Sequence, residues 1–138
     1  MNADKKMLHE DITGQIIKAF YKVNNTLGFG FWEKVYENAM KLELINMGLK
    51  VEQQKNIRVY YEGAEVGDYY DDMIVNDVVI IELKAAESLC EEHEAQLINY
   101  LKATTMEIGL LLNFGKKAEF RRKIFTNDRK NIKQWKSV

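Results

Sequence analysis

The chain has no proline, and Cys90 is its only cysteine. A single cysteine excludes an internal disulfide and a paired-cysteine metal site. No run of about 18 or more apolar residues is present to span a bilayer. The first six residues also lack the apolar stretch of a signal peptide. We therefore expect a cytoplasmic protein without a membrane partner.

Several sequence signatures of catalysis are missing as well. The chain contains neither a glycine-rich phosphate loop of the Walker or dinucleotide type nor a G-x-S-x-G elbow. Hydrophobic residues make up 46% of its 138 residues, which is enough for a compact domain with its own core. We expect a single domain over residues 1–138.

The formal net charge of -1 hides an asymmetry along the chain. Residues 116–138 carry nine Lys and Arg against two Asp and Glu, a net charge of +7, whereas residues 1–115 carry -8. A basic end beside an acidic body is typical of a polyanion-binding rim around a metal-binding centre. A solvated, charged tail is the simpler interpretation. On the last expected strand, Arg121, Arg122 and Lys123 are placed either to face phosphate or to protect a sheet edge.

Hydrophobic periodicity predicts helices on both sides of a group of strands. The expected helices cover residues 12–27, 35–47 and 91–103. The expected strands cover residues 57–61, a segment ending near 75, the apolar run 78–81, and residues 108–112 and 120–125, with turns at 62–63, 76–77 and 113–115. The first three strands indicate an antiparallel meander, and the helix that follows it returns the chain to the sheet. We therefore expect an α/β fold with a mixed central sheet flanked by helices.

The end of the apolar run carries an unexpected set of charges. Asp71 and Asp72 precede it, and Glu82-Leu83-Lys84 follows it directly. Charged residues are poor choices for a strand buried on both faces. Because strand side chains alternate, Glu82 and Lys84 share one face and Leu83 lies on the other.

The length of the turn decides which aspartate lies opposite Glu82. A two-residue turn at Asn76-Asp77 sets Asp71 against Glu82, whereas a three-residue turn that includes Val78 sets Asp72 there. The residues alone leave both alternatives open.

One aspartate with Glu82 supplies the carboxylates that Mg²⁺ or Mn²⁺ requires, and the backbone carbonyl of Leu83 supplies a third oxygen. Lys84 is then placed to orient or deprotonate a water molecule and to offset charge in the transition state of phosphodiester hydrolysis. The alternative is an ion-pair cluster that holds the strands together. Buried ion pairs stabilise proteins weakly, which favours the metal site.

The segment Gly30–Tyr36 resembles the G-x-x-E-x-x-Y signature of the GxxExxY proteins, a branch of the PD-(D/E)xK nuclease superfamily. The resemblance extends from about residue 12 to residue 114. Its other matching positions are Gly28, Tyr61, Gly63, the block from Asp72 to Lys84, His93, Gln96, Tyr100-Leu101 and Asn113-Phe114-Gly115.

This resemblance implies a restriction-endonuclease-like core, Asp72 and Glu82 as metal ligands, and Lys84 as the catalytic lysine. The spacing in the family favours the three-residue turn. The superfamily usually has proline before the aspartate, whereas this chain has Asp71.

Glu33 and Tyr36 belong to the matched signature. In related nucleases, Holliday junction resolvases among them, a glutamate on a helix before the sheet reaches into the active site, which makes Glu33 a catalytic candidate. The alternative is that Glu33 complements the helix dipole. Tyr36 shares its face of the helix and either contacts nucleic acid or packs in the core.

Gln96 and Tyr100 lie one turn apart on the helix after Lys84, on the same face as His93. Their spacing resembles the Gln-x-x-x-Tyr motif of several nucleases in this superfamily, whose amide positions water or substrate. We therefore expect Gln96 to be catalytic and Tyr100 to contact nucleic acid, unless Tyr100 is a core residue. His93 is expected to form hydrogen bonds and not to bind metal.

The sequence therefore predicts a metal-dependent nuclease that acts on DNA or, alternatively, on RNA. The competing hypothesis is a binding module for nucleic acid or protein that keeps the fold without turnover. A homodimer and a protein partner remain open.

Overall fold

The computed structural model describes residues 8–130 of the chain. Its helices and strands follow in the order α2 (Glu10–Leu27), α3 (Glu33–Asn46), β1 (Val51–Tyr61), β2 (Ala64–Val75), β3 (Val79–Lys84), α4 (Glu91–Lys102), β4 (Ile108–Phe114) and β5 (Ala118–Ile124). A short 3₁₀ helix, η1, covers Asn127–Arg129. No helix in the described part of the chain is long and apolar enough to cross a membrane.

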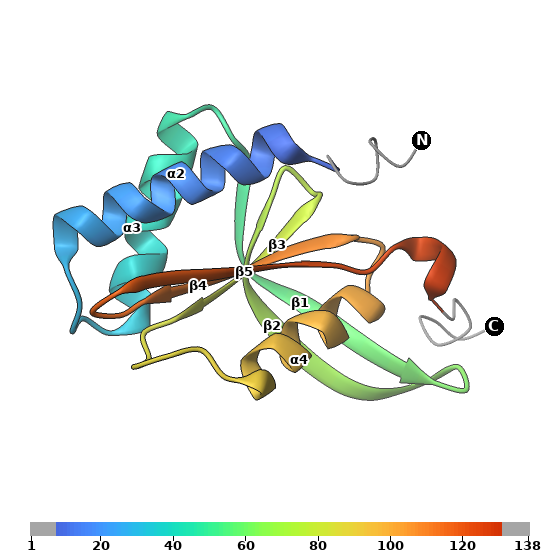
Figure 1. Ribbon diagram of the computed structural model, residues 1–138. Coiled ribbons are helices and arrows are strands. Elements are labelled where there is room, and N and C mark those ends of the chain that lie inside the picture. The colour runs from blue at the N-terminus through green and yellow to red at the C-terminus, as the bar shows by residue number, and fades with distance from the viewer. Residues whose placement is uncertain (1–7, 131–138) are drawn as a thin grey trace.

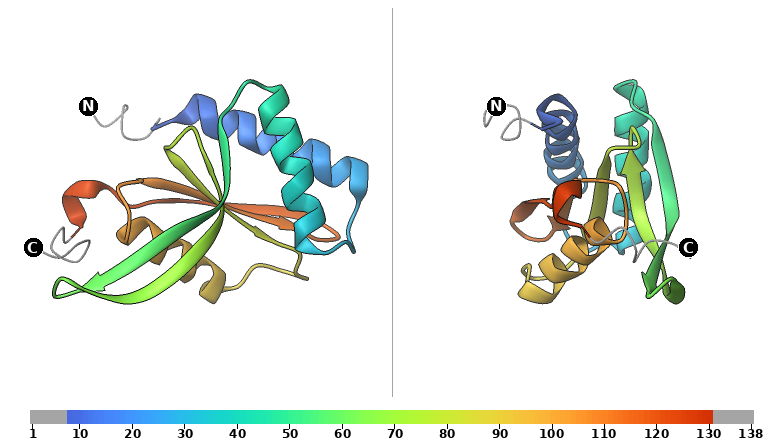
Figure 2. Two further views of the ribbon diagram at one scale, coloured as in Figure 1. Left: turned by 180° about the vertical axis from the view of Figure 1, so that it is seen from behind. Right: turned by 90° about the vertical axis from the view of Figure 1, so that its right-hand side faces the viewer.

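The five strands form one mixed sheet in the order β1-β2-β3-β4-β5. β1, β2 and β3 pair antiparallel, β3 and β4 pair parallel, and β5 returns antiparallel to β4. Helix α4 makes the crossover between the two parallel strands. The helices α2 and α3 lie on one side of the sheet and α4 lies on the other (Figures 1 and 2). The predicted mixed sheet with an antiparallel meander is therefore confirmed.

The helices bury two hydrophobic clusters against the sheet, one on each face. Strand alternation sends Met73, Ile81 and Leu83 into the cluster with α2 and α3, while Ile74 and Ile80 join the cluster with α4. Because β3 and β4 lie in the middle of the sheet, nearly all of their side chains are buried. This explains the continuous apolar runs of these two strands.

The β2–β3 hairpin has a three-residue turn. Val75 pairs with Val79, so Asn76, Asp77 and Val78 form the connection. Asn76 and Asp77 both have left-handed backbone, with φ of 51° and 59°, which these two residue types tolerate better than most. The Asn76 side chain also accepts a hydrogen bond from the backbone of Lys50 at 2.8 Å. The longer of the two predicted turns is therefore the one present.

The turn expected at residues 113–115 lies two residues later, at 115–117. Asn113 and Phe114 continue β4 and pair with Glu119 and Ala118. The buried Asn113 amide accepts a hydrogen bond from the backbone N–H of Ala86 and donates one to the carbonyl of the same residue. Two hydrogen bonds satisfy this polar side chain inside the sheet, so the strand does not need to end there.

Close packing of α4 on β4 depends on Gly109. A Cβ atom at this position would lie 2.6 Å from Cδ1 of Leu97. We expect Gly109→Ala to lower the free energy of unfolding by about 1–3 kcal/mol, measured by urea denaturation. Gly14→Ala is the control, because no atom lies within 4 Å of its added Cβ, and it should stabilise the protein by about 0.5–1 kcal/mol. Equal effects of the two substitutions would contradict this packing.

Candidate functional site

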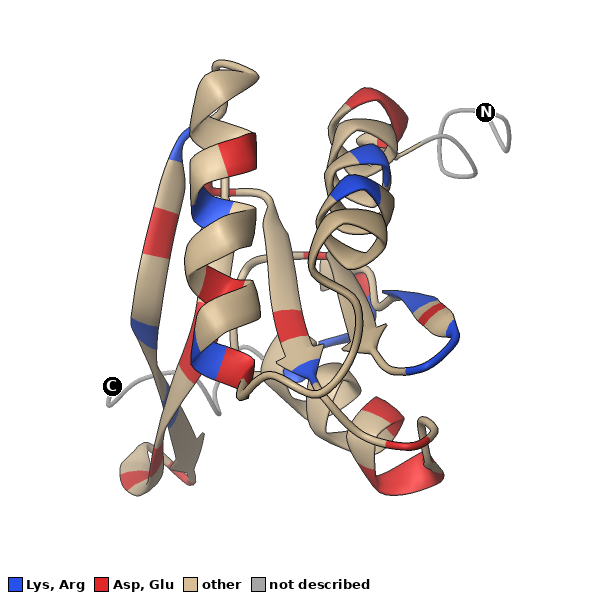
Figure 3. Cartoon of the chain, turned by 90° about the vertical axis from the view of Figure 1, so that its left-hand side faces the viewer, with Lys and Arg blue, Asp and Glu red and all other residues tan. Residues whose placement is uncertain are grey.

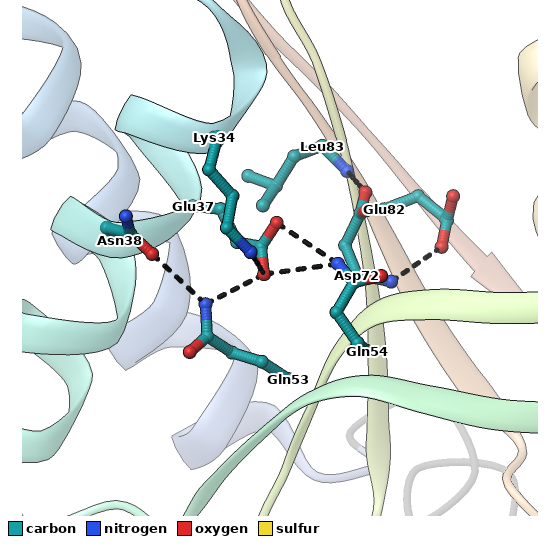
Figure 4. Close-up of polar contacts among 8 residues, drawn as sticks. All are labelled: Lys34, Glu37, Asn38, Gln53, Gln54, Asp72, Glu82 and Leu83. Atoms are coloured by element: carbon teal, nitrogen blue, oxygen red, sulfur yellow. Dashed lines mark hydrogen bonds and ion pairs between the residues drawn. The ribbon is translucent and has the colours of Figure 1, made fainter.

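The hairpin register brings Asp72 next to Glu82 at the open end of β2 and β3. The last ladder pair is Met73 with Ile81, and the next positions along the two strands are Asp72 and Glu82. Glu82 Oε2 accepts a hydrogen bond from the backbone N–H of Asp72 at 3.3 Å. Asp72 Oδ2 accepts one from the backbone N–H of Leu83 at 2.7 Å. The two carboxylates therefore lie beside each other's backbone (Figure 4).

The backbone of Leu83 belongs to the same site. Its N–H points towards Asp72, and in a strand the N–H and C=O of one residue point towards the same neighbouring strand. The Leu83 carbonyl therefore faces β2, while its buried side chain packs in the core with α2 and α3. Two carboxylates and one carbonyl thus lie around the junction of the two strands.

Asp71 adds a third carboxylate to this region. Its side chain is fully buried, and neither carboxylate oxygen has a hydrogen-bond partner among the described residues. Burial, together with the neighbouring carboxylates of Glu82 and Asp72, raises the pKa of Asp71 well above its usual range. An unpartnered buried carboxyl group is costly unless it holds a proton or meets a cation.

The acidic surroundings also act on Asp72. Burial is the main cause that raises the pKa of Asp72 to about 7, and the charge of Glu82 adds to it. The hydrogen bond from Leu83 acts in the opposite direction, and Glu37 and Glu33 on α3 raise the pKa further. The negative charges at this site therefore repel one another, and the hydrogen bonds within the site offset only part of that repulsion.

These donors fit a magnesium ion, which usually takes one or two carboxylates and fills its remaining positions with water and substrate phosphate. Within residues 8–130, no three or more His, Cys, Asp or Glu side chains are arranged to hold a metal ion on their own. Asp72, Glu82 and the Leu83 carbonyl would form the protein side of such a site. The buried oxygens of Asp71, which have no hydrogen-bond partner among the described residues, fit a cation beside these ligands.

Lys84 lies at the end of β3, opposite Asn113 of β4, and is partly buried. Strand alternation places it on the same face as Glu82. Its side chain forms no hydrogen bond or ion pair with another residue of the described part of the chain. The ammonium group is therefore not engaged in the ion-pair cluster that was the structural alternative.

Helix α3 brings two glutamates near Asp72, and only the first of them is part of the G-x-x-E-x-x-Y segment. Glu33 is exposed at the start of the helix, whereas Glu37, one turn later, is buried. Glu37 accepts hydrogen bonds from Gln53 at 2.7 Å and from Gln54 at 3.3 Å (Figure 4). The spacing of four residues from Glu33 was the available signal for Glu37.

Tyr36 is a core residue in this structure. It is fully buried and stacks on Phe114 with ring centroids 4.4 Å apart. Its hydroxyl donates to the carbonyl of Gly28 at 2.6 Å and accepts from the N–H of Phe31 at 3.2 Å. Tyr36 therefore stabilises the loop between α2 and α3. Because its side chain is buried in the core, it is not proposed to contact nucleic acid.

Removal of the Tyr36 hydroxyl tests this structural role. We expect Tyr36→Phe to lower the free energy of unfolding by about 1–2 kcal/mol, because two hydrogen bonds of the α2–α3 loop are lost. Tyr21→Phe is the matched control, since that ring is partly exposed and packs edge-on against Phe120. Chemical denaturation of both variants measures the difference. A loss no larger than that of the control would contradict the role.

Helix α4 presents Gln96 and Tyr100 to the site. Gln96 Nε2 donates to the Tyr100 hydroxyl at 2.8 Å. Burial is the main cause that raises the pKa of Tyr100 to about 12, and the charges of Glu82, Asp71 and Asp72 contribute. Tyr100 is therefore buried at the edge of the acidic region. His93 lies nearer the start of the helix, where its Nδ1 accepts a hydrogen bond from the N–H of Cys90.

The basic residues of β5 are engaged in contacts within the protein. Arg121 and Lys123 form ion pairs with Glu94 of α4, and Arg122 donates to the carbonyl of Leu8 at 2.9 Å. β5 is an edge strand of the sheet. These contacts favour protection of the edge over phosphate binding. The rest of the basic segment, residues 131–138, lies outside the described residues.

The comparison with protein families gave one informative result. The family model described as the PD-(D/E)XK nuclease superfamily matches residues 10–123, which include all three α-helices and nearly the whole sheet. Searches among curated proteins and among solved structures found no significant match. The three helices and the five-stranded mixed sheet agree with a restriction-endonuclease-like fold. The chain therefore belongs to the PD-(D/E)XK nuclease superfamily.

Proposed function

We propose that this protein is a Mg²⁺-dependent nuclease that hydrolyses phosphodiester bonds in DNA, with RNA as the alternative substrate and Mn²⁺ as the alternative ion. Within the superfamily, we assign it to the GxxExxY branch on the segment Gly30–Tyr36. The observation that carries the proposal is the register of the β2–β3 hairpin. It sets Asp72 beside Glu82 and leaves Lys84 two residues further along the same strand.

Asp72, Glu82 and the Leu83 carbonyl are the proposed ligands. A divalent ion held by these ligands would lower the pKa of a bound water molecule and polarise the phosphate. Lys84 is free of internal ion pairs within the described residues, and its ammonium group is proposed to orient the attacking water and to offset charge on the phosphoryl oxygens.

The flanking helices provide the proposed supporting residues. Gln96, which is held by Tyr100, is proposed to position water or substrate with its amide. Glu33 is exposed beside the acidic site, where it is proposed to assist the attack. Buried Glu37 accepts hydrogen bonds from Gln53 and Gln54 of β1 and so links α3 to the sheet.

A binding module without turnover is the second candidate. It is favoured by the two carboxylates, because each accepts a hydrogen bond from a backbone N–H of the opposite strand. In a catalytic site the second oxygen of each carboxylate remains for the metal. In a pure binding module the same hydrogen bonds would simply hold β2 and β3 together.

Cleavage of end-labelled single-stranded, duplex and branched DNA and of RNA, each with Mg²⁺, with Mn²⁺ or with EDTA, separates the two candidates. We expect cleavage with either ion and none with EDTA. Glu82→Gln, purified in parallel, should abolish the activity. Cleavage that persists in this variant would identify a contaminating nuclease, and wild-type protein that cleaves no substrate would reject the proposed function.

A further inference from the structure

A cleft of about 820 Å³ opens beside the candidate site. Its walls come from α4, from the β1–β2 hairpin and from the residues that follow β5. The hairpin extends beyond the body of the protein alongside α4 (Figure 2). We propose that this cleft binds an unpaired strand of nucleic acid and guides it to the candidate site. This inference rests on the proposed function and names the form of its substrate.

The cleft and the carboxylates share structural elements. Tyr69 in its wall lies on β2, two residues before Asp71, and contacts Tyr100 of α4 with ring centroids 5.8 Å apart. Tyr100 in turn binds Gln96, and both residues also line the cleft. The cleft therefore ends at side chains that adjoin the candidate site, because Tyr100 lies at the edge of the acidic region and Tyr69 lies on the strand that carries Asp71.

The lining suits nucleobases. Tyr60, Tyr69, Tyr100 and Phe125 line the cleft, and Tyr69 is 49% exposed. An exposed aromatic side chain inside a cleft offers a surface on which unpaired bases stack. Each base has a flat face, so stacking of this kind tolerates any sequence.

The charges of the cleft suit a phosphodiester backbone. Lys102, Arg129 and Lys130 line it against a single acidic residue, Glu92. The Lys130 ammonium group donates to the carbonyls of Thr104 and Met106 at 2.8 and 2.7 Å. Arg129 is therefore the residue expected to contact phosphate. The Lys102 ammonium group and the Arg129 guanidinium group lie over the Phe125 ring at 5.6 and 4.4 Å from its centroid. Elsewhere acidic and basic residues are interspersed over the helices and strands (Figure 3). The cleft therefore combines cations with aromatic rings next to an acidic centre.

The size of the cleft and its aromatic rings indicate that the bound nucleic acid is unpaired. A volume of this order accommodates a ligand of roughly drug-like size, which corresponds to very few nucleotides. The bases of a duplex are stacked on one another, so their faces are not available to the exposed ring of Tyr69. An unpaired strand, a frayed end or a flap supplies the free bases that stacking on Tyr69 requires.

Fluorescence anisotropy with a labelled single-stranded DNA 12-mer and its duplex, in EDTA to prevent cleavage, tests the inference. We expect the single strand to bind more tightly than the duplex. Tyr69→Ala should weaken single-strand binding about tenfold, and Arg129→Gln should lower the slope of log affinity against log salt by about 1. Tyr61→Ala, an exposed tyrosine of β1 outside the cleft lining, should bind as the wild type does.

The inference is overturned if the duplex binds as tightly as the single strand, if Tyr69→Ala binds as Tyr61→Ala does, or if neither DNA binds. These outcomes are distinguishable from failure of the proposed function. Binding that depends on Tyr69 without any metal-dependent cleavage leaves the inference intact and rejects the nuclease. Metal-dependent cleavage with binding that is indifferent to Tyr69 rejects the inference alone.

Discussion

Lys84→Ala should reduce metal-dependent cleavage by about 100-fold or more while the protein remains folded and able to bind nucleic acid. The reason is the position of the side chain. It lies two residues after Glu82 on the same face of β3, and it has no ion-pair partner among the described residues that its removal would expose. Single-turnover cleavage with saturating enzyme measures the chemical step directly.

Lys18→Ala is the matched control for loss of a lysine. Lys18 is exposed on α2, on the other side of the sheet from α4, and its removal should change neither cleavage nor stability. Thermal denaturation of both variants should agree with that of the wild type to within a few degrees. If Lys84→Ala cleaves as fast as the wild type, Lys84 has no part in the mechanism. This conclusion would hold whatever the role of the carboxylates.

Asp71→Asn should change how the stability of the metal-free protein depends on pH. Folding raises the pKa of Asp71, so between its unfolded and folded pKa values the folded protein binds more protons than the unfolded chain. The stabilisation is complete below the unfolded pKa and is lost as the pH rises through the folded pKa. Each such group lowers the free energy of unfolding by up to about 1.4 kcal/mol per pH unit. Asparagine does not titrate, so Asp71→Asn removes this loss of stability.

We expect the wild type in EDTA to lose stability from pH 5 to pH 9, and Asp71→Asn to lose clearly less. Asp72, with its pKa raised to about 7, retains part of the pH dependence in the variant. Asp11→Asn, at an exposed position in the first turn of α2, is the control and should follow the wild type. Urea denaturation at several pH values measures the effect. Parallel curves for wild type and Asp71→Asn would contradict the burial of an unpartnered carboxyl group.

Local rules predict which strand ends carry the candidate site residues. Strand alternation placed Glu82 and Lys84 on one face, and hairpin geometry limited the partner of Glu82 to two aspartates. The choice of Asp72 required the family spacing, because Asn76 and Asp77 tolerate left-handed backbone in either length of turn.

Other features depend on contacts between distant residues, which periodicity does not encode. Glu37 is buried because Gln53 and Gln54 reach it from β1, where Gln54 has a left-handed φ of 52°. The helical spacing places Glu37 on the face of Glu33, but it does not show that Glu37 is buried. The cleft was also missed, because its walls come from the β1–β2 hairpin, from α4 and from residues after β5, which lie far apart in the sequence. Asn113 was assigned to a turn because its hydrogen bonds to Ala86 come from another loop.

Calorimetric titration of Mn²⁺ into the wild-type protein tests whether Asp72 and Glu82 form a metal site. We expect a binding site in the wild type that is lost in both Asp72→Asn and Glu82→Gln. Its affinity should rise from pH 6 to pH 8, because metal must displace protons from carboxyl groups whose pKa values are raised. Absence of Mn²⁺ binding by the wild type at pH 8, even with uncleaved DNA present, would contradict the metal site. Binding of Mn²⁺ by both variants as tight as that of the wild type would also contradict it.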